Sequence, residues 1–145
     1  MIILDTNVIS ALISSRPDRS VITWLDKQPR VSIWTTSVTI LEIRYGLQIM
    51  PAGKRRTALM EAFERVSAEL LELRIAPFDA AAAREASDLM SIRHKLGRTV
   101  ELRDTMIAGI TLACHAMLAT RNTAHFDDLS VPVINPFTEP QATHI

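Results

Sequence analysis

Apolar residues are distributed along the chain in short continuous runs that alternate with longer stretches, where they recur every three or four positions. Short runs bounded by turn-forming residues predict strands, here at 2–4, 31–34, 73–75, 117–120 and 131–134. The longer stretches predict helices after position 7 and over 19–27, 37–49, 54–71, 80–96 and 102–116. Strands that alternate with helices are typical of a parallel sheet covered on both faces, so we expect the α/β class.

Helix-start and helix-stop residues delimit several of these segments. Thr36 or Ser37 can cap the helix that ends before Pro51, and Asp79 can cap the helix that Gly97 stops. No repeat, low-complexity segment or linker interrupts the pattern. We therefore expect one domain over residues 1–145, with a frayed tail from about position 136.

Composition narrows the class of protein without identifying a partner. The 145 residues are 48% hydrophobic and 22% charged, as in an ordinary globular domain. No apolar run approaches the roughly 20 residues that span a bilayer, and the N-terminus lacks the basic start of a signal peptide, so we expect a cytoplasmic protein with no membrane partner. Cys114, the only cysteine, falls in an apolar helical pattern and is expected to be a small core residue. Sixteen basic and sixteen acidic residues cancel, so net charge neither predicts nor excludes nucleic-acid binding.

Polar side chains follow two of the predicted strands at their carboxyl ends. Asp5 directly follows the run at 2–4, and Asn122 lies just beyond the run at 117–120. Open parallel sheets bind ligands beyond the carboxyl ends of their strands. We therefore expect both side chains at one edge of the sheet, close enough to act together.

Two further acids, Glu42 and Asp104, interrupt apolar helix faces. The residues that share these faces are Val38, Tyr45 and Ile49 for Glu42, and Ile107, Ala108 and Thr111 for Asp104. An unpaired buried carboxylate is strongly disfavoured, and three inward-facing acids repel one another. A hard divalent cation with oxygen ligands relieves that repulsion. We therefore expect Mg²⁺ or Mn²⁺ to be bound by Asp5, Glu42 and Asp104.

Each of these acids also has a purely structural interpretation. Asp5 can cap the helix that follows it, and Glu42 can close a capping box with Thr39. Asp104 can be an acid in the first turn of a helix, where the helix dipole favours it. The coincidence of all three, each beside an apolar segment, favours the metal-site interpretation.

Four motifs along the chain occur in the order and spacing of a known family. They are segment 3–10 with Asp5, segment 41–47 with Glu42, Gly97 and Arg98 followed by Asp104 and 107–108, and segments 119–122 and 131–136 with Phe126 between them. Through these motifs nearly the whole chain resembles the PIN-domain nucleases. Among them it is similar to the VapC-type toxins of bacterial toxin–antitoxin modules, close to the FitB-like group.

The resemblance implies a three-layer α/β/α fold with a central parallel sheet. It also implies an acidic pocket in which Asp5, Glu42 and Asp104 bind one or two Mg²⁺ or Mn²⁺ ions, and endonucleolytic hydrolysis of RNA by a metal-activated water. The implied partners are the RNA substrate, a second copy of the chain in a homodimer, a cognate antitoxin protein, and operator DNA reached only through the antitoxin. We expect the C-terminal segment of the antitoxin to occupy the acidic groove and to offer an arginine to the carboxylates.

The family's fourth acidic position corresponds to Asn122 in this sequence. An amide oxygen can ligate magnesium directly or through water, but it supplies no charge, so the number of metal ions stays open. Asp127 and Asp128 lie a few residues on and could substitute, although a surface loop is their simpler location.

RNA must approach the acidic pocket despite its own negative charge, so basic residues are expected around it. Arg98 and Arg121 are the candidates by position. The basic runs 54–56 and 93–95 are expected to be solvated helix faces. The four histidines show neither metal-ligand spacing nor pairing with a nucleophile, and we expect them at the surface or in packing contacts.

Two other magnesium-dependent α/β classes match less well. A receiver-type signalling domain carries a paired acid after its first strand and a lysine after its last, and neither is present here. A haloacid-dehalogenase phosphatase needs Asp-x-Asp where this chain has Asp5, Thr6 and Asn7. The remaining alternative is a non-catalytic metal-binding module that acts through an antitoxin–DNA complex.

Overall fold

A parallel β-sheet forms the centre of the computed structural model, which describes residues 1–137. Within that range the sheet has five strands in the order β3-β2-β1-β4-β5. The strands are β1 (Ile2–Leu4), β2 (Ile33–Thr36), β3 (Ile75–Ala76), β4 (Met117–Ala119) and β5 (Val133–Ile134). Every pair is parallel, and Ile2 of β1 is in register with Ile33 and with Met117. The order reverses at β1 and β4, which creates the kind of switch point where open sheets bind ligands.

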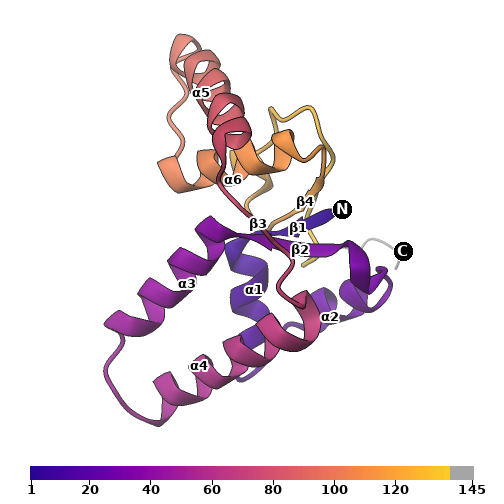
Figure 1. The fold of residues 1–145 in the computed structure, drawn as a ribbon, viewed down its shortest axis with the longest axis vertical. Coiled ribbons are helices and arrows are strands. Elements are labelled where there is room, and N and C mark those ends of the chain that lie inside the picture. The colour runs from indigo at the N-terminus through magenta and orange to yellow at the C-terminus, as the bar shows by residue number, and fades with distance from the viewer. Residues whose placement is uncertain (138–145) are drawn as a thin grey trace, which may run out of the picture.

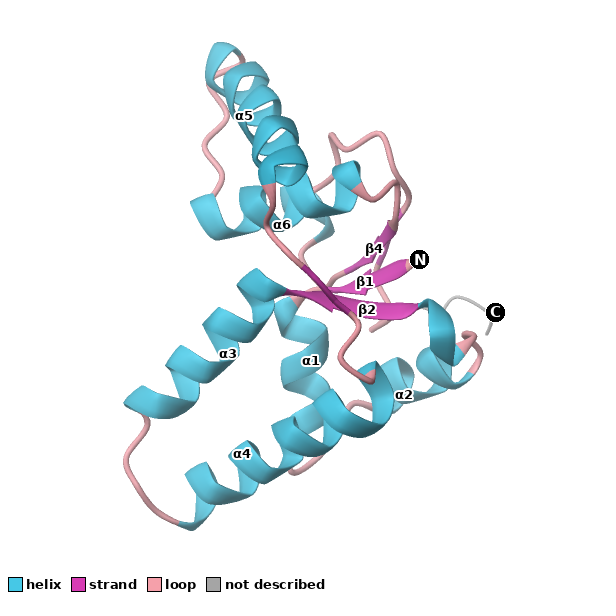
Figure 2. Ribbon diagram, viewed as in Figure 1, coloured by secondary structure: helices cyan, strands magenta, loops and turns pink. Residues whose placement is uncertain are grey.

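Helices cover both faces of the sheet (Figure 1). They are α1 (Thr6–Ile13), α2 (Arg19–Asp26), α3 (Ser37–Ile49), α4 (Lys54–Arg65), α5 (Ala80–Lys95) and α6 (Leu102–Ala113). A π-helical segment, Val66–Leu71, continues α4. Figure 2 shows α1 to α4 on one side of the strands and α5 with α6 on the other. The expected three-layer α/β/α architecture is therefore confirmed.

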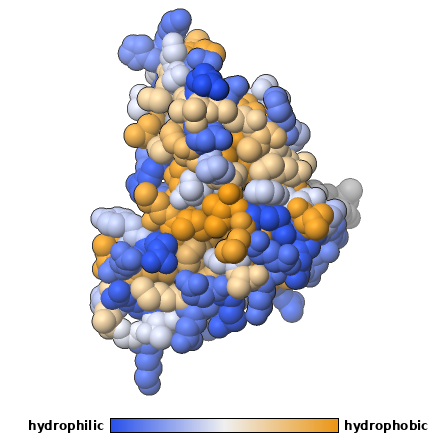
Figure 3. Space-filling model, viewed as in Figure 1, coloured by the Kyte–Doolittle hydropathy of each residue, from blue (hydrophilic) through white to orange (hydrophobic). Residues whose placement is uncertain are grey.

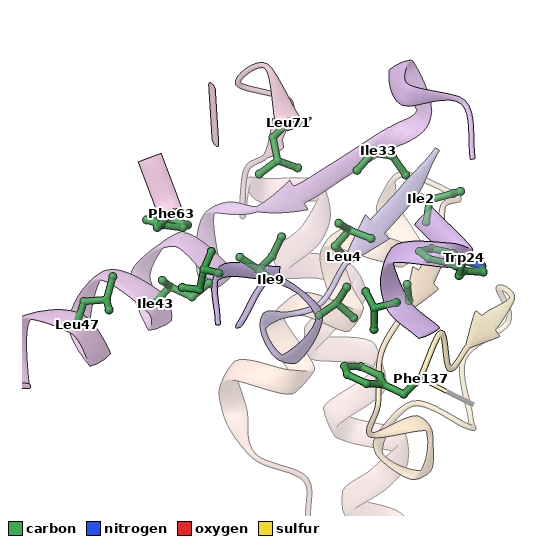
Figure 4. Packing of buried hydrophobic residues seen from close by; sticks show 14 residues of the cluster. Ile2, Leu4, Ile9, Trp24, Ile33, Ile43, Leu47, Phe63, Leu71 and Phe137 are labelled. Carbon is green, nitrogen blue, oxygen red and sulfur yellow. The ribbon is translucent and has the colours of Figure 1, made fainter. Parts of the chain in front are cut away.

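Two apolar clusters hold the layers together. The larger joins Ile2 and Leu4 of β1 to α1, α2, α3 and α4, with Trp24 and Phe63 among its buried members (Figure 4). The smaller joins Ile3 and Leu118 to α5 and α6. Side chains of β1 thus alternate between two cores, as expected for a strand covered on both faces. Burial of such side chains, at roughly 25 cal/mol per Å² of apolar surface, is the main stabilising contribution.

The helices α5 and α6 approach each other closely at Gly109. A Cβ atom at this position would lie 2.5 Å from the carbonyl oxygen of Ala82 and 2.8 Å from the Cβ of Ala86. Only a residue without a side chain permits this contact. Gly109 therefore fixes the distance between α6, which carries Asp104, and its neighbour.

Several element boundaries differ from the sequence prediction because of local backbone geometry. The strand predicted at 31–34 begins at Ile33, since Arg30–Ser32 form a 3₁₀ turn after Pro29. The strand predicted at 73–75 shifts to Ile75–Ala76, because Glu72 and Leu73 have φ of 47° and 62°. The helix predicted over 102–116 ends at Ala113.

The prediction for Cys114 was wrong. This residue is the C-cap of α6 and is exposed, whereas the apolar pattern placed it in the core. The helix stops there because His115 turns into the left-handed region with φ of 51°. Partial desolvation by its neighbours raises the pKa of the Cys114 thiol even at this exposed position, with a smaller contribution from the negative charge of Asp79.

The prediction of a frayed tail from about 136 was wrong for its first residues. Pro136 and Phe137 are buried, and Phe137 belongs to the larger apolar cluster. The guanidinium of Arg121 lies 3.7 Å from the centre of the Phe137 ring, a cation–π contact. The rest of that predicted tail, 138–145, lies outside the described residues. None of the helices between residues 1 and 137 is long and apolar enough to cross a membrane.

Candidate active site

Asp5 lies at the switch point of the sheet, where β1 ends and α1 begins. Its side chain is the N-cap of α1, and its Oδ1 accepts a hydrogen bond of 2.8 Å from the backbone N–H of Thr6. Its Oδ2 accepts from the Thr120 hydroxyl at 2.7 Å and from Nδ2 of Asn7 at 3.2 Å. Asp5 is only 2% exposed. The capping role weighed for Asp5 is therefore present, and it coexists with a position at the edge of the sheet.

Burial raises the pKa of the Asp5 carboxyl to about 6. The hydrogen bonds from Thr120 and Thr6 act against this shift, and the negative charges of Asp104 and Glu42 add to it. The three acids predicted from sequence therefore share one electrostatic environment. A buried carboxylate with two like charges nearby is stabilised by a cation.

Glu42 lies on α3 and is not part of the cap of that helix. Thr36 is the N-cap, and its hydroxyl accepts from the N–H of Thr39, so the capping box considered for Glu42 does not form. Oε1 of Glu42 accepts a 2.8 Å hydrogen bond from the Thr6 hydroxyl, and Oε2 lies 3.7 Å from Nη1 of Arg103. The Glu42 side chain is 17% exposed. Its carboxylate is thus oriented toward the start of α1.

The face of α3 that contains Glu42 is not buried along its length. Val38 is buried, but Tyr45 and Ile49 on the same face are exposed. The apolar face that Glu42 interrupts is therefore buried only near its start, because α3 projects away from the sheet toward its C-terminal end (Figure 1). Beside Glu42 a hollow of about 750 Å³ opens between α1, α3 and α4.

Asp104 lies in the first turn of α6, as the sequence predicted. The residues that share its face, Ile107, Ala108 and Thr111, are all buried. Its Oδ2 lies 2.8 Å from Nδ1 of His125, a residue in the short 3₁₀ turn Thr123–His125 after β4. The acid is thus held near the helix N-terminus, where the dipole favours it, and is fixed by an imidazole from another element.

A buried arginine positions the loop that carries His125. Arg93 of α5 is 2% exposed and makes a bidentate ion pair with Asp128, with both N···O distances 2.8 Å. It also donates to the His125 carbonyl oxygen at 2.9 Å and to the Thr105 hydroxyl at 3.1 Å. The prediction that the basic run 93–95 is a solvated helix face was therefore wrong for Arg93.

The other candidates from sequence have separate roles in this region. Arg98 donates to Asp127 at 2.8 Å and to the carbonyl oxygen of Ala124, so it holds the loop after β4. The two loop acids, Asp127 and Asp128, are thus paired with arginines. The pKa of the Asp128 carboxyl is lowered, chiefly by its hydrogen bond from Arg93. Asn122 contacts the site through its backbone, since its N–H donates to the Thr120 hydroxyl at 3.0 Å.

Oxygen donors dominate the cluster, which suits a hard divalent cation. Asp5, Glu42 and Asp104 come from three different elements, which cover both faces of the sheet and begin near the carboxyl ends of its strands (Figure 2). In residues 1–137, no three acidic, histidine or cysteine side chains gather around a single point closely enough to hold a metal ion. Each carboxylate instead has its own partner. The donor chemistry and the raised pKa of Asp5 fit a divalent cation.

Sequence reasoning missed several side chains of the site, among them Asn7, which donates to Asp5. Thr6, Thr120 and His125 each bind one of the three acids, and Arg103 lies near Glu42. Thr6 and Thr120 fall within the motifs that carry Asp5 and Asn122, so proximity in sequence was an available signal. No such signal marks His125, because its pairing spans 21 residues and depends on the loop conformation.

The sheet, its switch point and the three acids define an α/β protein with an acidic site at the carboxyl ends of its strands. The chain belongs to the PIN-domain family, whose sequence model matches residues 2–131.

Individual relatives agree with this assignment. VapC ribonuclease Y4jK from Sinorhizobium fredii is 40% identical over 137 residues, which are 94% of this chain and 98% of that protein. In the structure of FitAB bound to an IR36 DNA fragment, the matching chain is 32% identical with a TM-score of 0.84, over 94% of this chain and 96% of that one. VapBC-5 from Mycobacterium tuberculosis, a member of the VapBC family of toxin–antitoxin systems, is 26% identical with a TM-score of 0.65, over 92% and 96%.

Proposed function

We propose that this protein is the toxin of a toxin–antitoxin module and a magnesium-dependent endoribonuclease that hydrolyses RNA phosphodiester bonds. The observation that carries the proposal is the common environment of Asp5, Glu42 and Asp104 at the switch point of the sheet. Membership of the PIN-domain family and the similarity to a protein named VapC ribonuclease support it.

Asp5, Glu42 and Asp104 are the residues that would hold Mg²⁺ or Mn²⁺, and Asn122 is a candidate fourth ligand. When bound, the cation orients the scissile phosphate, stabilises charge on its oxygens and lowers the pKa of a water molecule. If a single ion is bound, Asp104 or Glu42 would also position the attacking water. Hydrolysis by water leaves a 5′-phosphate and a 3′-hydroxyl.

The chain's own residues orient the acids for this task. The Thr120 and Thr6 hydroxyls donate to Asp5 and Glu42, which fixes the direction of their lone pairs. His125 does the same for Asp104. Such outer contacts set the orientation of ligating carboxylates and add to their affinity for a metal. Arg103, near Glu42, and the candidates Arg98 and Arg121 supply positive charge near the entering phosphates.

We further propose that a cognate antitoxin binds this chain, that a homodimer is the working form, and that operator DNA is reached through the antitoxin. The solved complexes of similar chains, one of them with DNA, support this assignment. The hollow beside Glu42 is large and partly apolar, which suits a segment of a partner protein. An arginine from that segment would pair with the carboxylates in place of the cation. A cytoplasmic location fits these partners.

Cleavage of mixed cellular RNA by purified, antitoxin-free protein tests the proposal. We expect discrete cuts with 5′-phosphate ends in the presence of Mg²⁺, and no cuts with EDTA or with D5A or D104N. D88N is the matched control, because Asp88 is an exposed acid of α5 away from the site, and it should cut normally.

Two results would contradict the proposal in different ways. Cutting that persists in EDTA would exclude the mechanism based on three acids. A folded, antitoxin-free protein that cuts no RNA would favour the alternative, a non-catalytic metal-binding module that acts through an antitoxin–DNA complex.

A further inference from the structure

Two separate hollows flank α1, and they differ in chemistry. The larger, beside Glu42, is lined mainly by apolar residues of α1, α3 and α4. The smaller, of about 450 Å³, is lined by polar and charged side chains, among them Asn7, Ser10, Ser14, Arg16, Asp18 and Arg121. Ser10 and Ser14 border both hollows. The N-terminus of α1, with Asp5, lies between them.

We propose that the smaller hollow binds backbone phosphates of the RNA strand next to the bond that is cut. This inference rests on the proposed ribonuclease function and deepens it by assigning a path to the substrate. Phosphate contacts supply much of the affinity of proteins for nucleic acids and fix the position of the strand. We refer to this hollow as the phosphate groove.

The charges of the phosphate groove favour an anion. No acidic side chain in residues 1–137 pairs with the guanidinium of Arg16 or with that of Arg121, whose contact is the Phe137 ring at 3.7 Å. The one carboxylate in the lining, Asp18, is engaged as the N-cap of α2 and accepts from the N–H groups of Ser20 and Val21 at 2.8 and 3.2 Å. Two arginines therefore line the groove, while its carboxylate accepts the capping hydrogen bonds of α2.

The groove is connected directly to the acidic site through Asn7. Its Nδ2 donates to Oδ2 of Asp5, and its Oδ1 accepts from the backbone N–H of Arg121 at 3.0 Å. Asn7 thus joins a proposed metal ligand to the segment that carries one of the two arginines. A strand held by Arg121 would have its neighbouring phosphate near Asp5.

The face of α1 that lines the groove supplies hydrogen-bond donors at helical spacing. Asn7, Ser10 and Ser14 are three and four positions apart, so their amide and hydroxyl groups lie on one side of the helix. Such groups bind phosphate and sugar oxygens without regard to base sequence. The larger hollow shares Ser10 and Ser14 with the groove, but Leu12, Ile13 and Leu47 form part of its wall.

Binding of a labelled single-stranded RNA, measured by fluorescence anisotropy in EDTA over a range of salt concentrations, tests the proposal. EDTA separates binding from cleavage. The double variant R16Q/R121Q should bind about tenfold or more weakly at low salt. Its plot of log affinity against log salt should be shallower by about 1.4, because each single-strand phosphate contact contributes roughly 0.7. The matched control R44Q/R84Q removes two exposed arginines of α3 and α5 and should keep the slope.

A charge-preserving variant guards against loss of structure. R16K/R121K should retain the salt slope, and all variants should be folded at the temperature of the assay. An unchanged slope in R16Q/R121Q, an equal change in the control pair, or no binding of RNA by the unmodified protein would each overturn the proposal.

Cleavage with Mg²⁺ distinguishes failure of this inference from failure of the proposed function. R16Q/R121Q should raise KM with little change in kcat. If R16Q/R121Q cuts RNA with the same KM as the unmodified protein, the phosphate groove is overturned and the proposed ribonuclease function stands. If RNA binding depends on Arg16 and Arg121 but the protein cuts no RNA, the ribonuclease function is contradicted and the phosphate groove stands.

Discussion

Nδ1 of His125 lies 2.8 Å from Oδ2 of Asp104, which links the loop after β4 to the first turn of α6. The imidazole is half exposed, whereas the carboxylate is 15% exposed. This contact gives a proposed metal ligand a fixed orientation. The imidazole can orient Asp104 only while the loop after β4 keeps its position. Arg93 of α5 and Arg98, just after α5, hold that loop by hydrogen bonds to its carbonyl oxygens.

Removal of the imidazole should weaken metal binding. We expect H125A to lower the affinity for Mn²⁺, measured by titration calorimetry without RNA, by roughly 10- to 100-fold, the usual effect of losing an outer contact to a metal ligand. H125N, whose amide can reach Asp104, should recover part of the loss. H115N is the control, because His115 is an exposed histidine at the opposite end of α6 in a backbone conformation that asparagine tolerates. Equal affinity in H125A and the unmodified protein would refute this role.

The two arginines that hold the loop should differ in their effect on stability. R93M removes a buried cation and leaves Asp128 with only its 3.5 Å ion pair to Arg98. We therefore expect the free energy of unfolding to fall by about 3 kcal/mol. R98M breaks an ion pair whose acid, Asp127, is 65% exposed, and should cost at most about 1 kcal/mol. Urea denaturation of both variants measures the difference, and similar midpoints would contradict the assigned burial.

The raised pKa of Asp5 predicts an unusual pH dependence of stability. Without metal, the folded chain keeps a proton on Asp5 up to about pH 6, whereas the unfolded chain releases it near the ordinary value of 3.8. The folded state therefore binds more protons in this interval, and the stability should fall as the pH rises from about 4 to about 6. The contribution of this group is roughly 3 kcal/mol at most.

Urea midpoints in EDTA from pH 4 to pH 8 measure this effect. The difference between the unmodified protein and D5N isolates the carboxyl, because the variant has no proton to lose there. At pH 7, added Mg²⁺ should raise the melting temperature of the unmodified protein and not that of D5N. Parallel pH profiles of the two proteins would show that Asp5 has an ordinary pKa.

The contact at Gly109 predicts opposite outcomes for two glycine substitutions. G109A forces a methyl group against the Ala82 carbonyl and should destabilise the protein by about 1–3 kcal/mol. G46A, at a helical position with no atom within 4 Å of the new Cβ, should instead stabilise it by up to about 1 kcal/mol. Thermal unfolding of both variants provides the comparison, and a neutral G109A would mean that α5 and α6 pack less closely.

Elements with local signals were predictable from the sequence. The cap at Thr36 and the proline at position 51 delimit α3, and Asp79 caps α5, as predicted. Strand boundaries were less accessible, because they depend on pairing with distant segments. Thr35, for example, donates its N–H to the carbonyl oxygen of Arg74, a contact that no local pattern specifies.

The same distinction applies to the candidate site. Asp5, Glu42 and Asp104 could be found because a carboxylate beside apolar residues is recognisable in a sequence. The buried position of Arg93 was also encoded, since Ala82, Ala86, Leu89 and Arg93 follow helical spacing along one buried face. The burial of Arg93 was not predicted, because runs of charged residues usually form solvated helix faces. Its partner Asp128 is 35 residues away, and that pairing exists only in the folded chain.

Both edge strands of the sheet, β3 and β5, are two residues long. Such short edges leave few unpaired backbone groups with which a strand from another molecule could form hydrogen bonds. Partners are therefore expected to bind through helices and side chains rather than by extending the sheet. The same feature limits edge-to-edge aggregation of the chain when no partner protein is bound to it.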